Sequence, residues 1–283
     1  MVTGSSRGLG LSIARAYARE GAAVVLSSRS QAESEQAAAG VAGPGVKSAG
    51  FACDVADLEQ VEALAEAAVH AFGRLDIWVN NAGKAGPYGP TASIPEELFK
   101  SVISTNIIGT YHGSIAALRY FIPQGSGKLI NILGRGDDQP VPFQNAYASS
   151  KSWIRAFTVA MAKEYKNSGV GIFAYNPGLM RTEFMSRVEA VEGYSNRLKP
   201  LETVMRLWSN PPDLPAEKAV WLASSATDGK TGLVIRTISP VSLLGGVLRE
   251  GARRLTGRSG PEYHLEVSEV PSALQEPVRK AVP

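Results

Sequence analysis

The sequence predicts a single α/β domain in which helices cover both faces of a doubly wound parallel sheet, giving three layers, α/β/α. Two observations carry this prediction: short apolar runs alternate with amphipathic helical patterns along most of the 283 residues, and the first alternation opens on a glycine-rich turn. With 44% hydrophobic and 19% charged residues, the composition is that of an ordinary globular protein with enough apolar side chains for one core.

The first helix and strand show the pattern most clearly. Apolar residues recur at helical spacing from Leu11 to Glu20, and Gly21 stands where helices commonly end. The continuous apolar run 22–26 is typical of a parallel strand buried on both faces. The same alternation predicts further helices at 31–40, 58–72, 96–120, 146–165 and 216–223, and strands at 51–53, 77–79, 128–133, 170–175 and 233–235.

Two stretches depart from this rhythm. Met1 and Val2 lead directly into the turn, so the first strand is either very short or begins upstream. Residues 179–213 fit either a substrate lid or an irregular surface insertion.

The chain is expected to divide into a dinucleotide-binding domain at 1–238 and a C-terminal extension of unknown role at 239–283. Four arginines of the extension fall near one helical face, as in a solvated or inter-subunit helix: Arg249, Arg253, Arg254 and Arg258.

Composition excludes several classes of function. A net charge of +3 without long basic runs gives no reason to expect nucleic-acid binding. The single cysteine, Cys53, offers neither a disulfide nor a shared metal site, so a reducing, cytoplasmic location and no metal are expected. No apolar run reaches the roughly 18 residues of a membrane helix, and no signal peptide is recognisable.

The turn Thr3-Gly4-Ser5-Ser6-Arg7-Gly8-Leu9-Gly10 places three glycines between a strand and a helix. Bare backbone and free helix N–H groups at such a turn suit a pyrophosphate, although a tight structural turn alone would use the same residues. Its place inside a β-α-β unit favours a dinucleotide site of the Rossmann type.

The second strand indicates which dinucleotide binds. NAD sites usually end this strand with an acid, but here it ends in Ser28 and Arg29. Arg29, with Arg7 in the turn, suits a 2′-phosphate, so NADP(H) is predicted over NAD(H); the alternative is two surface arginines. Asp54, before Val55, could accept a hydrogen bond from adenine or start a helix.

Tyr147 and Lys151 stand four positions apart, so on a helix they share one face and can point into one cleft. A phenol is a poor proton carrier near neutral pH unless a nearby cation stabilises its ionised form, which Lys151 can do. The alternative is an ordinary surface tyrosine and a solvated lysine.

Five motifs in register resemble the short-chain dehydrogenase/reductase family over residues 3 to about 238. They are the turn at 3–10, Asn80-Asn81-Ala82-Gly83, Asn106, Tyr147-x-x-x-Lys151, and Pro177-Gly178 with Thr182. The resemblance implies a homodimer or homotetramer and a small carbonyl or alcohol substrate.

The resemblance also implies roles for the matching residues. Tyr147 would exchange a proton with the substrate oxygen, Lys151 would hold the nicotinamide ribose, and Asn106 would support a water that leads protons to Lys151. The expected cofactor-binding residues are Gly4, Ser6, Arg7, Gly8, Leu9, Gly10, Ser28, Arg29, Asp54, Val55, Asn81, Ala82, Gly83, Tyr147, Lys151, Pro177, Gly178 and Thr182.

One position departs from the family pattern. The family places a serine thirteen residues before the tyrosine, but Gly134 stands there, and no Ser or Thr occurs from Gly127 through Ala146. The next residue, Arg135, could polarise a carbonyl or bind an anionic substrate, or it could pair with Asp137 or Asp138, which is the favoured interpretation.

The leading hypothesis is therefore an NADP(H)-dependent oxidoreductase that interconverts a carbonyl and an alcohol. The alternatives are a non-catalytic dinucleotide-binding sensor or scaffold that has lost the serine, and a different reaction on the same fold, such as dehydration or epimerisation.

Overall fold

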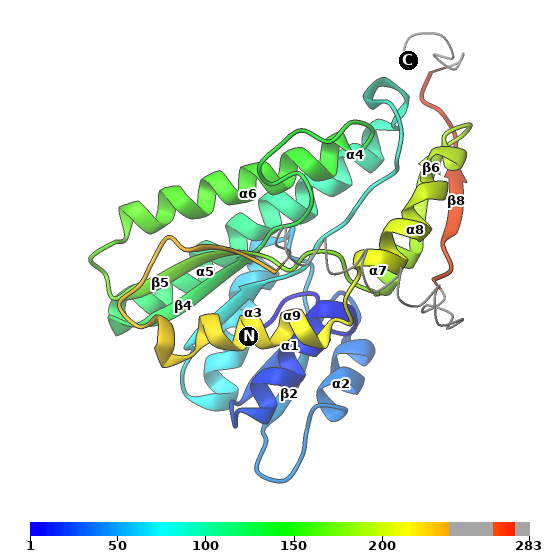
Figure 1. Cartoon of the computed structure of the whole chain (residues 1–283). Helices are drawn as coiled ribbons and strands as arrows, with labels where there is room; N and C mark the ends of the chain where they lie inside the picture. The colour runs from blue at the N-terminus through cyan, green and yellow to red at the C-terminus, as the bar shows by residue number, and fades with distance from the viewer. Residues whose placement is uncertain (238–262, 275–283) are drawn as a thin grey trace, which may run out of the picture.

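The computed structural model of the chain describes residues 1–237 and 263–274 (Figure 1). Its α-helices are α1 (Gly8–Arg19), α2 (Gln31–Ala39), α3 (Leu58–Phe72), α4 (Glu96–Ile103), α5 (Gly109–Gln124), α6 (Asn145–Glu164), α7 (Glu183–Ser186), α8 (Lys199–Trp208) and α9 (Asp213–Ala223). Its strands are β1 (Val24–Ser28), β2 (Ser48–Ala52), β3 (Ile77–Asn80), β4 (Gly127–Ile132), β5 (Val170–Asn176), β6 (Arg187–Val191), β7 (Val234–Arg236) and β8 (Glu266–Val270).

The main sheet is parallel throughout. β1 pairs with β2, and β3, β4, β5 and β7 pair in that order. Val2 bridges Leu26 on one side and Val79 on the other, which joins the two groups into one sheet. The predicted doubly wound parallel fold is confirmed.

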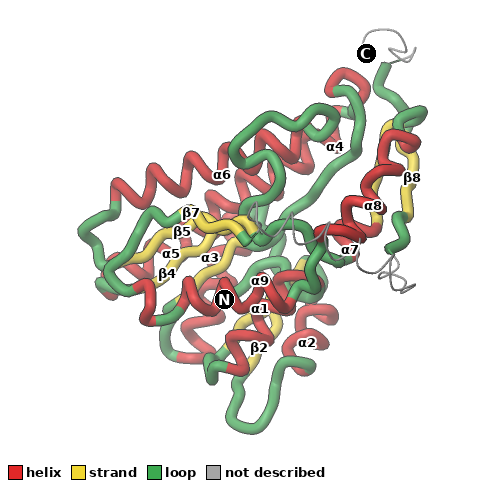
Figure 2. Tube along the Cα trace, in the orientation of Figure 1, coloured by secondary structure: helices red, strands yellow, loops and turns green. Residues whose placement is uncertain are grey.

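Alternate residues of the strands face opposite layers. Leu26 and Ile130 pack in one cluster with α1, α2 and α9, whereas Val25 and Leu129 pack in another with α3, α5 and α6. Figures 1 and 2 show the strands lying between these two groups of helices. Both faces are therefore buried, which accounts for the continuous apolar runs of the central strands.

Local signals set the helix ends. Asp57 caps α3 by accepting hydrogen bonds from the N–H groups of Glu59 and Gln60, at 3.0 and 3.3 Å. Gly73 follows the same helix with φ +82°, a left-handed conformation that glycine adopts without strain.

The long helix expected at 96–120 has a wider turn inside it. Ser104–Ile108 form a π-helical turn between α4 and α5, and Asn106 lies in this turn with its side chain fully buried. Helical periodicity predicted the helix but carries no signal for the wider turn.

Residues 179–213 are not an irregular insertion, because they contain α7, β6 and α8. β6 pairs in parallel with β8 of the C-terminal extension, from Arg187 opposite Glu266 to Val191 opposite Val270. Figures 1 and 2 show this small sheet beside α8, at one side of the main body. The helical face expected for the four tail arginines lies outside the described residues.

Within residues 1–237 and 263–274, no helix combines the length and apolar character needed to cross a membrane. The same residues contain no group of three or more His, Cys, Asp or Glu side chains placed to hold a metal ion.

Candidate active site

The glycine turn is built for close backbone contact. Gly4 has φ +61°, and a Cβ added to it would lie 2.7 Å from the Cα of Ala82. A Cβ on Gly10 would lie 2.5 Å from both the Nδ2 of Asn81 and the carbonyl oxygen of Gly4. Larger side chains at these positions would displace the turn, so glycine is required by its own surroundings.

Thr3 and Asn81 hold this turn against the end of β3. The Thr3 hydroxyl accepts hydrogen bonds from the N–H groups of Asn81 and Ala82 at 3.1 and 3.2 Å. The side-chain amide of Asn81 donates to the carbonyl oxygens of Thr3 and Gly4, both at 2.9 Å. The geometry thus gives Asn81 a scaffolding contact, and its contact with the cofactor remains a prediction.

The start of α1 carries free backbone donors. Arg7 is the N-cap of this helix, and its side chain makes no capping hydrogen bond. Its guanidinium instead forms an exposed ion pair with Glu183 at 3.2 Å. The first N–H groups of α1 therefore point at the turn as they do in a phosphate site.

The predicted adenosine-side residues lie at the ends of β1 and β2. Arg29 is exposed directly after β1, and the Ser28 hydroxyl donates to the carbonyl oxygen of Ser30 at 3.0 Å. Asp54 Oδ1 accepts from the N–H of Ala56 at 3.0 Å. The idea that Asp54 starts a helix is wrong, because Asp57 caps α3.

Ser6 and Glu33 mark the hollow between α1 and α2. The Ser6 hydroxyl donates to Glu33 Oε2 at 3.3 Å, and both residues line a depression of about 480 Å³. Arg7 and Arg15 line it as well. No local pattern predicts Glu33 here, because its approach depends on how α2 packs beside the turn.

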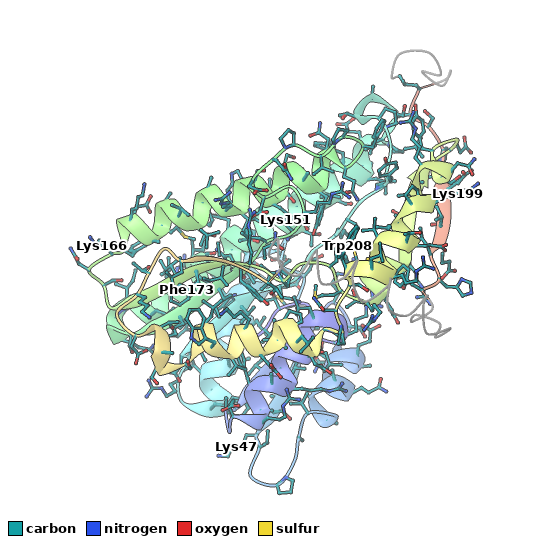
Figure 3. All side chains as sticks on the ribbon, viewed as in Figure 1. Lys47, Lys151, Lys166, Phe173, Lys199 and Trp208 are labelled. Atoms are coloured by element: carbon teal, nitrogen blue, oxygen red, sulfur yellow. The ribbon has the colours of Figure 1, made fainter. Side chains whose placement is uncertain are left out.

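Tyr147 and Lys151 share one face of α6. The Lys151 ammonium lies 5.5 Å from the centroid of the Tyr147 ring and donates to the carbonyl oxygen of Ile132 at 3.0 Å. Lys151 is only 5% exposed, and Figure 3 shows it inside the molecule, whereas Lys166 and Lys199 extend from its surface. The surface-lysine alternative is therefore wrong.

Burial shapes the titration of this pair. It raises the pKa of Tyr147 well above its usual range, and the nearby carboxylate of Asp137 adds to the rise. Burial lowers the pKa of Lys151 to about 8, against an opposing contribution from Asp137. Both groups thus depart from their ordinary titration, as groups at reactive sites often do.

Asn106 joins the π turn to the same region. Its Oδ1 accepts from the N–H of Lys84 at 2.8 Å, and its Nδ2 donates to the carbonyl oxygen of Lys84 and to Ser150 at 2.9 and 3.0 Å. A Cβ on Gly83 would lie 3.4 Å from Asn106 Oδ1 and 3.9 Å from Lys151 Nζ. Asn106, Gly83 and Lys151 are therefore neighbours, and the water that Asn106 would support remains a prediction.

The segment after β5 crosses beside the glycine turn. Gly178 has φ +79° and donates its N–H to Asn176 Oδ1 at 3.0 Å. Thr182, at the start of α7, would lie 3.7 Å from a Cβ on Gly8. Phe184, which is 40% exposed, places its ring centroid 6.0 Å from that of Tyr147. This segment therefore lies between the turn and the Tyr147 face.

The loop after β4 also contacts α6. A Cβ on Gly134 would lie 2.2 Å from the Tyr147 hydroxyl oxygen. Arg236 binds Asp137 and Asp138 at 2.8 and 2.6 Å, so the expected pairing of Arg135 with these acids is wrong. Arg135 is exposed and has no ion pair within the described parts of the chain.

Sequence reasoning missed Arg236 and Asn176 as members of this site. Asn176 Nδ2 donates to Asp137 Oδ1 at 3.0 Å and to the carbonyl oxygen of Gly134 at 3.1 Å. Asn176 could have been found, because polar residues at the carboxyl ends of parallel strands commonly line the site of an α/β sheet. Arg236 carried no signal, because its partners lie 98 and 99 residues away.

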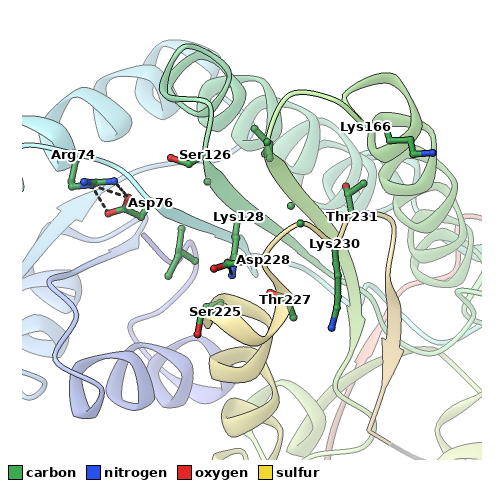
Figure 4. A pocket seen from close by; sticks show the side chains of 17 residues that line it. Arg74, Asp76, Ser126, Lys128, Lys166, Ser225, Thr227, Asp228, Lys230 and Thr231 are labelled. Atoms are coloured by element: carbon green, nitrogen blue, oxygen red, sulfur yellow. Dashed lines mark hydrogen bonds and ion pairs between the residues drawn. The ribbon is translucent and has the colours of Figure 1, made fainter.

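A second hollow, of about 420 Å³, lies at the opposite edge of the sheet (Figure 4). It is lined by the amino ends of β4 and β5, and its charges are largely paired: Arg74 with Asp76 at 2.6 Å and Lys128 with Asp228 at 2.8 Å. Ligands of α/β sheets bind at the carboxyl ends of the strands, so this hollow is not the candidate site.

Comparison with known proteins agrees with this geometry. The sequence model of the short chain dehydrogenase family matches residues 1–193. A putative ketoacyl reductase of Streptomyces coelicolor is 33% identical over 198 residues, which span 69% of this chain and 75% of that protein.

Two solved structures share the fold over 85% of this chain, both at 26% identity. An actinorhodin polyketide ketoreductase with NADPH has a TM-score of 0.76 and is covered over 95% of its length. A 3-ketoacyl-(acyl-carrier-protein) reductase from Brucella melitensis, complexed with NADH, has a TM-score of 0.74 and is covered over 96%. The chain therefore belongs to the short-chain dehydrogenase/reductase family, and it is an oxidoreductase acting on a CH–OH/C=O group.

Proposed function

We propose that this chain is an NADP(H)-dependent oxidoreductase that interconverts a carbonyl and an alcohol, with Tyr147 as its general acid/base. The observation that carries the proposal is the pair on α6: a buried ammonium, Lys151, 5.5 Å from the ring of a tyrosine at the carboxyl edge of the sheet. A cation in this place stabilises the phenolate that forms when Tyr147 gives its proton to a carbonyl oxygen.

The residues of the glycine turn fit a nicotinamide dinucleotide. A Cβ at Gly10 would meet backbone and side-chain atoms at 2.5 Å, and α1 begins without a side-chain cap, so bare backbone and free N–H groups face the site. When bound, the cofactor supplies the hydride, which passes at nicotinamide C4. Thr182 and Gly178, between the turn and Tyr147, would hold the carboxamide.

NADP(H) is preferred because no acid follows β1, where Ser28 and the exposed Arg29 stand instead. Arg7 gives a second positive charge; its exposed pair with Glu183 is weak and can be exchanged for a phosphate. The two solved relatives hold NADPH and NADH, so the fold admits either dinucleotide and the side chains decide.

The cofactor preference is tested with Arg29→Ala. Removing one charge-assisted contact of about 1.5–3 kcal/mol is expected to weaken NADPH binding about tenfold or more and to leave NADH binding unchanged. Arg19→Ala, at the far end of α1, is the matched control. Equal losses for both dinucleotides would contradict the preference.

The titration of the pair suits reduction near neutral pH. The raised pKa of Tyr147 keeps its proton in place until a carbonyl oxygen is presented. Lys151, with a pKa of about 8, is mostly an ammonium at pH 7. Asn106 would support the water that returns protons to Lys151, because its Oδ1 keeps a second lone pair beside Gly83.

Gly134 stands where the family places its serine, so Tyr147 acts on the substrate oxygen without that hydroxyl. Losing one such donor typically lowers the rate about 10² to 10³-fold, which is small beside the 10⁶-fold or greater acceleration common among enzymes. A working reductase is therefore compatible with glycine at this position.

A second copy of the chain would cover the outer face of α5. Ile108 and Tyr111 are 39% and 43% exposed, and Tyr111 contacts Phe157 of α6 with ring centroids 6.2 Å apart. An apolar surface of this kind favours a homodimer or homotetramer. Light scattering coupled to size exclusion would measure the mass, and a monomer at micromolar concentration would contradict this assembly.

The function itself is tested by calorimetric titration with NADPH and NADH, followed by turnover of ketones, aldehydes and secondary alcohols. Tyr147→Phe is expected to keep cofactor binding and to lose about 10² to 10⁴-fold in kcat/KM. Tyr165→Phe, at the end of the same helix, controls for loss of a phenol. Tight binding without turnover would favour a cofactor sensor, and failure to bind either dinucleotide would exclude both functions.

A further inference from the structure

The loop from Gly134 to Asp138 lies against α6 at a distance that only glycine permits. A Cβ on Gly134 would come within 2.2 Å of the Tyr147 hydroxyl oxygen. Gly136 has φ +94°, and its Cβ would lie 2.4 Å from the Cβ of Ala148. The two glycines therefore serve one purpose, which is to bring this loop down onto the helix that carries Tyr147.

The close approach brings Asp137 into the interior. This residue is 5% exposed, and its two carboxylate oxygens have separate partners: Oδ1 accepts from Asn176 Nδ2 at 3.0 Å, and Oδ2 accepts from Arg236 at 2.8 Å. Asn176 Nδ2 also donates to the carbonyl oxygen of Gly134 at 3.1 Å. One amide thus ties both ends of the loop to the end of β5.

The charge on Asp137 is only partly balanced. Its partner Arg236 also binds Asp138 at 2.6 Å, so one guanidinium serves two carboxylates. Among the residues that the structure describes, the other charged or titratable groups that act on this cluster are Tyr147, Lys151 and Arg155 on α6; Arg155 acts on Asp138. Asp137 raises the pKa of both Tyr147 and Lys151, so its negative charge acts on both groups of the reactive pair.

We propose that Asp137 is a positioning residue of this site: clamped by Asn176 and Arg236, it holds the loop against α6 and supplies a fixed negative charge beside the Tyr147–Lys151 pair. This inference rests on the proposed function of that pair. The charge keeps Lys151 an ammonium to higher pH and keeps the proton on Tyr147, and the loop takes the space in which a serine would stand.

Asp137 and Arg236 provide the test, because removing the negative charge and removing the positive charge change the electrostatic potential at Lys151 in opposite directions. Asp137→Asn keeps an oxygen for Asn176 but removes the negative charge, so the pKa of Lys151 should fall. Arg236→Gln removes the balancing positive charge, so the pKa of Lys151 should rise. Asp138→Asn, which loses a contact with the same arginine from an exposed site, is the matched control and should move it little.

The first readout is the pH dependence of kcat/KM for reduction with NADPH. Its basic limb is expected to move to lower pH in Asp137→Asn and to higher pH in Arg236→Gln, each by about one pH unit. A residue that only braces the fold would lower activity in both variants without moving the limb in opposite directions. Shifts of the same sign, or no shift in either variant, would overturn the proposal.

The second readout needs neither cofactor nor substrate. The difference in unfolding free energy between each chain and its Lys151→Met counterpart is measured by urea denaturation from pH 6 to pH 11. Its change with pH reports the folded-state pKa of Lys151. The onset of that change, near pH 8 in the parent chain, should move down in Asp137→Asn and up in Arg236→Gln.

The two readouts separate failure of this inference from failure of the proposed function. If the parent chain turns over no carbonyl or alcohol, the function fails, and the denaturation experiment still decides whether Asp137 sets the titration of Lys151. If turnover depends on Tyr147 but neither readout shows opposite shifts, the function stands and the role of Asp137 is wrong.

Discussion

Two glycine-rich loops lie at the carboxyl edge of the same sheet, and they use glycine for different neighbours. In the turn at 3–10, glycine brings backbone close to Asn81 while the first N–H groups of α1 have no side-chain cap. In the loop at 134–138, glycine brings the backbone against α6. The carbonyl oxygen of Gly134 and the carboxylate of Asp137 accept hydrogen bonds from Asn176 and Arg236, respectively. The backbone of the first loop is left open to a ligand, whereas the backbone of the second loop packs against helix α6 of the same chain.

The largest expected effect comes from placing serine in the second loop. Gly134→Ser introduces the serine that the family resemblance implies here, but it puts a Cβ 2.2 Å from the Tyr147 hydroxyl oxygen, so the loop or the tyrosine must move. Misplacing Tyr147, the proposed general acid, is expected to lower kcat/KM about 10²-fold or more while NADPH affinity is retained.

Gly43→Ser is the control, because a Cβ at Gly43 meets nothing within 4 Å. Steady-state kinetics and NADPH titration give both quantities for each variant. An increase in kcat/KM for Gly134→Ser would show that the glycine is simply a lost serine and that the two loops do not differ in the way described.

The second prediction concerns the stability cost of the buried ammonium under that loop. Burial lowers the pKa of Lys151 from its ordinary value of 10.5, which applies to the unfolded chain, to about 8 in the folded chain. Between these values the unfolded chain binds the extra proton, so stability rises as pH rises from about 8 to 10.5, and below 8 the full cost of burial remains. At about 1.4 kcal/mol per pH unit, Lys151→Met should raise the unfolding free energy by up to about 3 kcal/mol at pH 7.

Urea denaturation at pH 7 and at pH 11 measures this gain. It should shrink toward zero at the higher pH, where Lys151 is neutral in both states, and turnover should be lost at both. A variant that is less stable than the parent at pH 7 would contradict the assignment of a costly buried charge to this residue.

Sequence alone predicted the first loop and its surroundings well. Three local features could be recognised in a single sequence: the glycine spacing, the strand before Arg29 and the four-residue step from Tyr147 to Lys151. For the same reason the α/β alternation gave the order of the helices and strands.

The contacts of the second loop and the elements within residues 179–213 could not be predicted in the same way. Arg236 reaches Asp137 across 99 residues, and Arg187 reaches Glu266 across 79, so neither contact has a local pattern. Residues 179–213 contain regular elements, but β6 takes its partner strand from the C-terminal extension, about 80 residues further along the chain. Long-range pairing, rather than propensity, decides these parts.

The third prediction returns to the first loop. Gly10→Ala adds a Cβ that would lie 2.5 Å from Asn81 Nδ2 and from the carbonyl oxygen of Gly4, so the turn must open. NADPH affinity should fall about tenfold or more, a loss of at least about 1.4 kcal/mol. Gly40→Ala, whose nearest contacts are 3.5 and 3.6 Å, is the control and should bind normally.

Calorimetric titration measures both variants. If Gly10→Ala binds NADPH as the parent does, the turn at 3–10 tolerates a side chain and does not form the close cofactor cradle. The turn at 3–10 would then no longer differ from the loop at 134–138 by being shaped for a ligand.

The smallest expected effect tests what fastens the second loop to α6. The Ser152 hydroxyl donates to the carbonyl oxygen of Gly136, whereas the Ser149 hydroxyl, one turn earlier, donates within the helix to Asn145 at 2.6 Å. Ser152→Ala should lower the unfolding free energy by about 1 kcal/mol, and Ser149→Ala by less, because only the first removes a contact between loop and helix. Urea denaturation resolves this difference, and kcat/KM should change only slightly in either variant, because Asn176 and Arg236 still hold the loop. Equal stability of the two variants would mean that the clamp at Asp137, without help from Ser152, fixes the loop at the distance that excludes a serine.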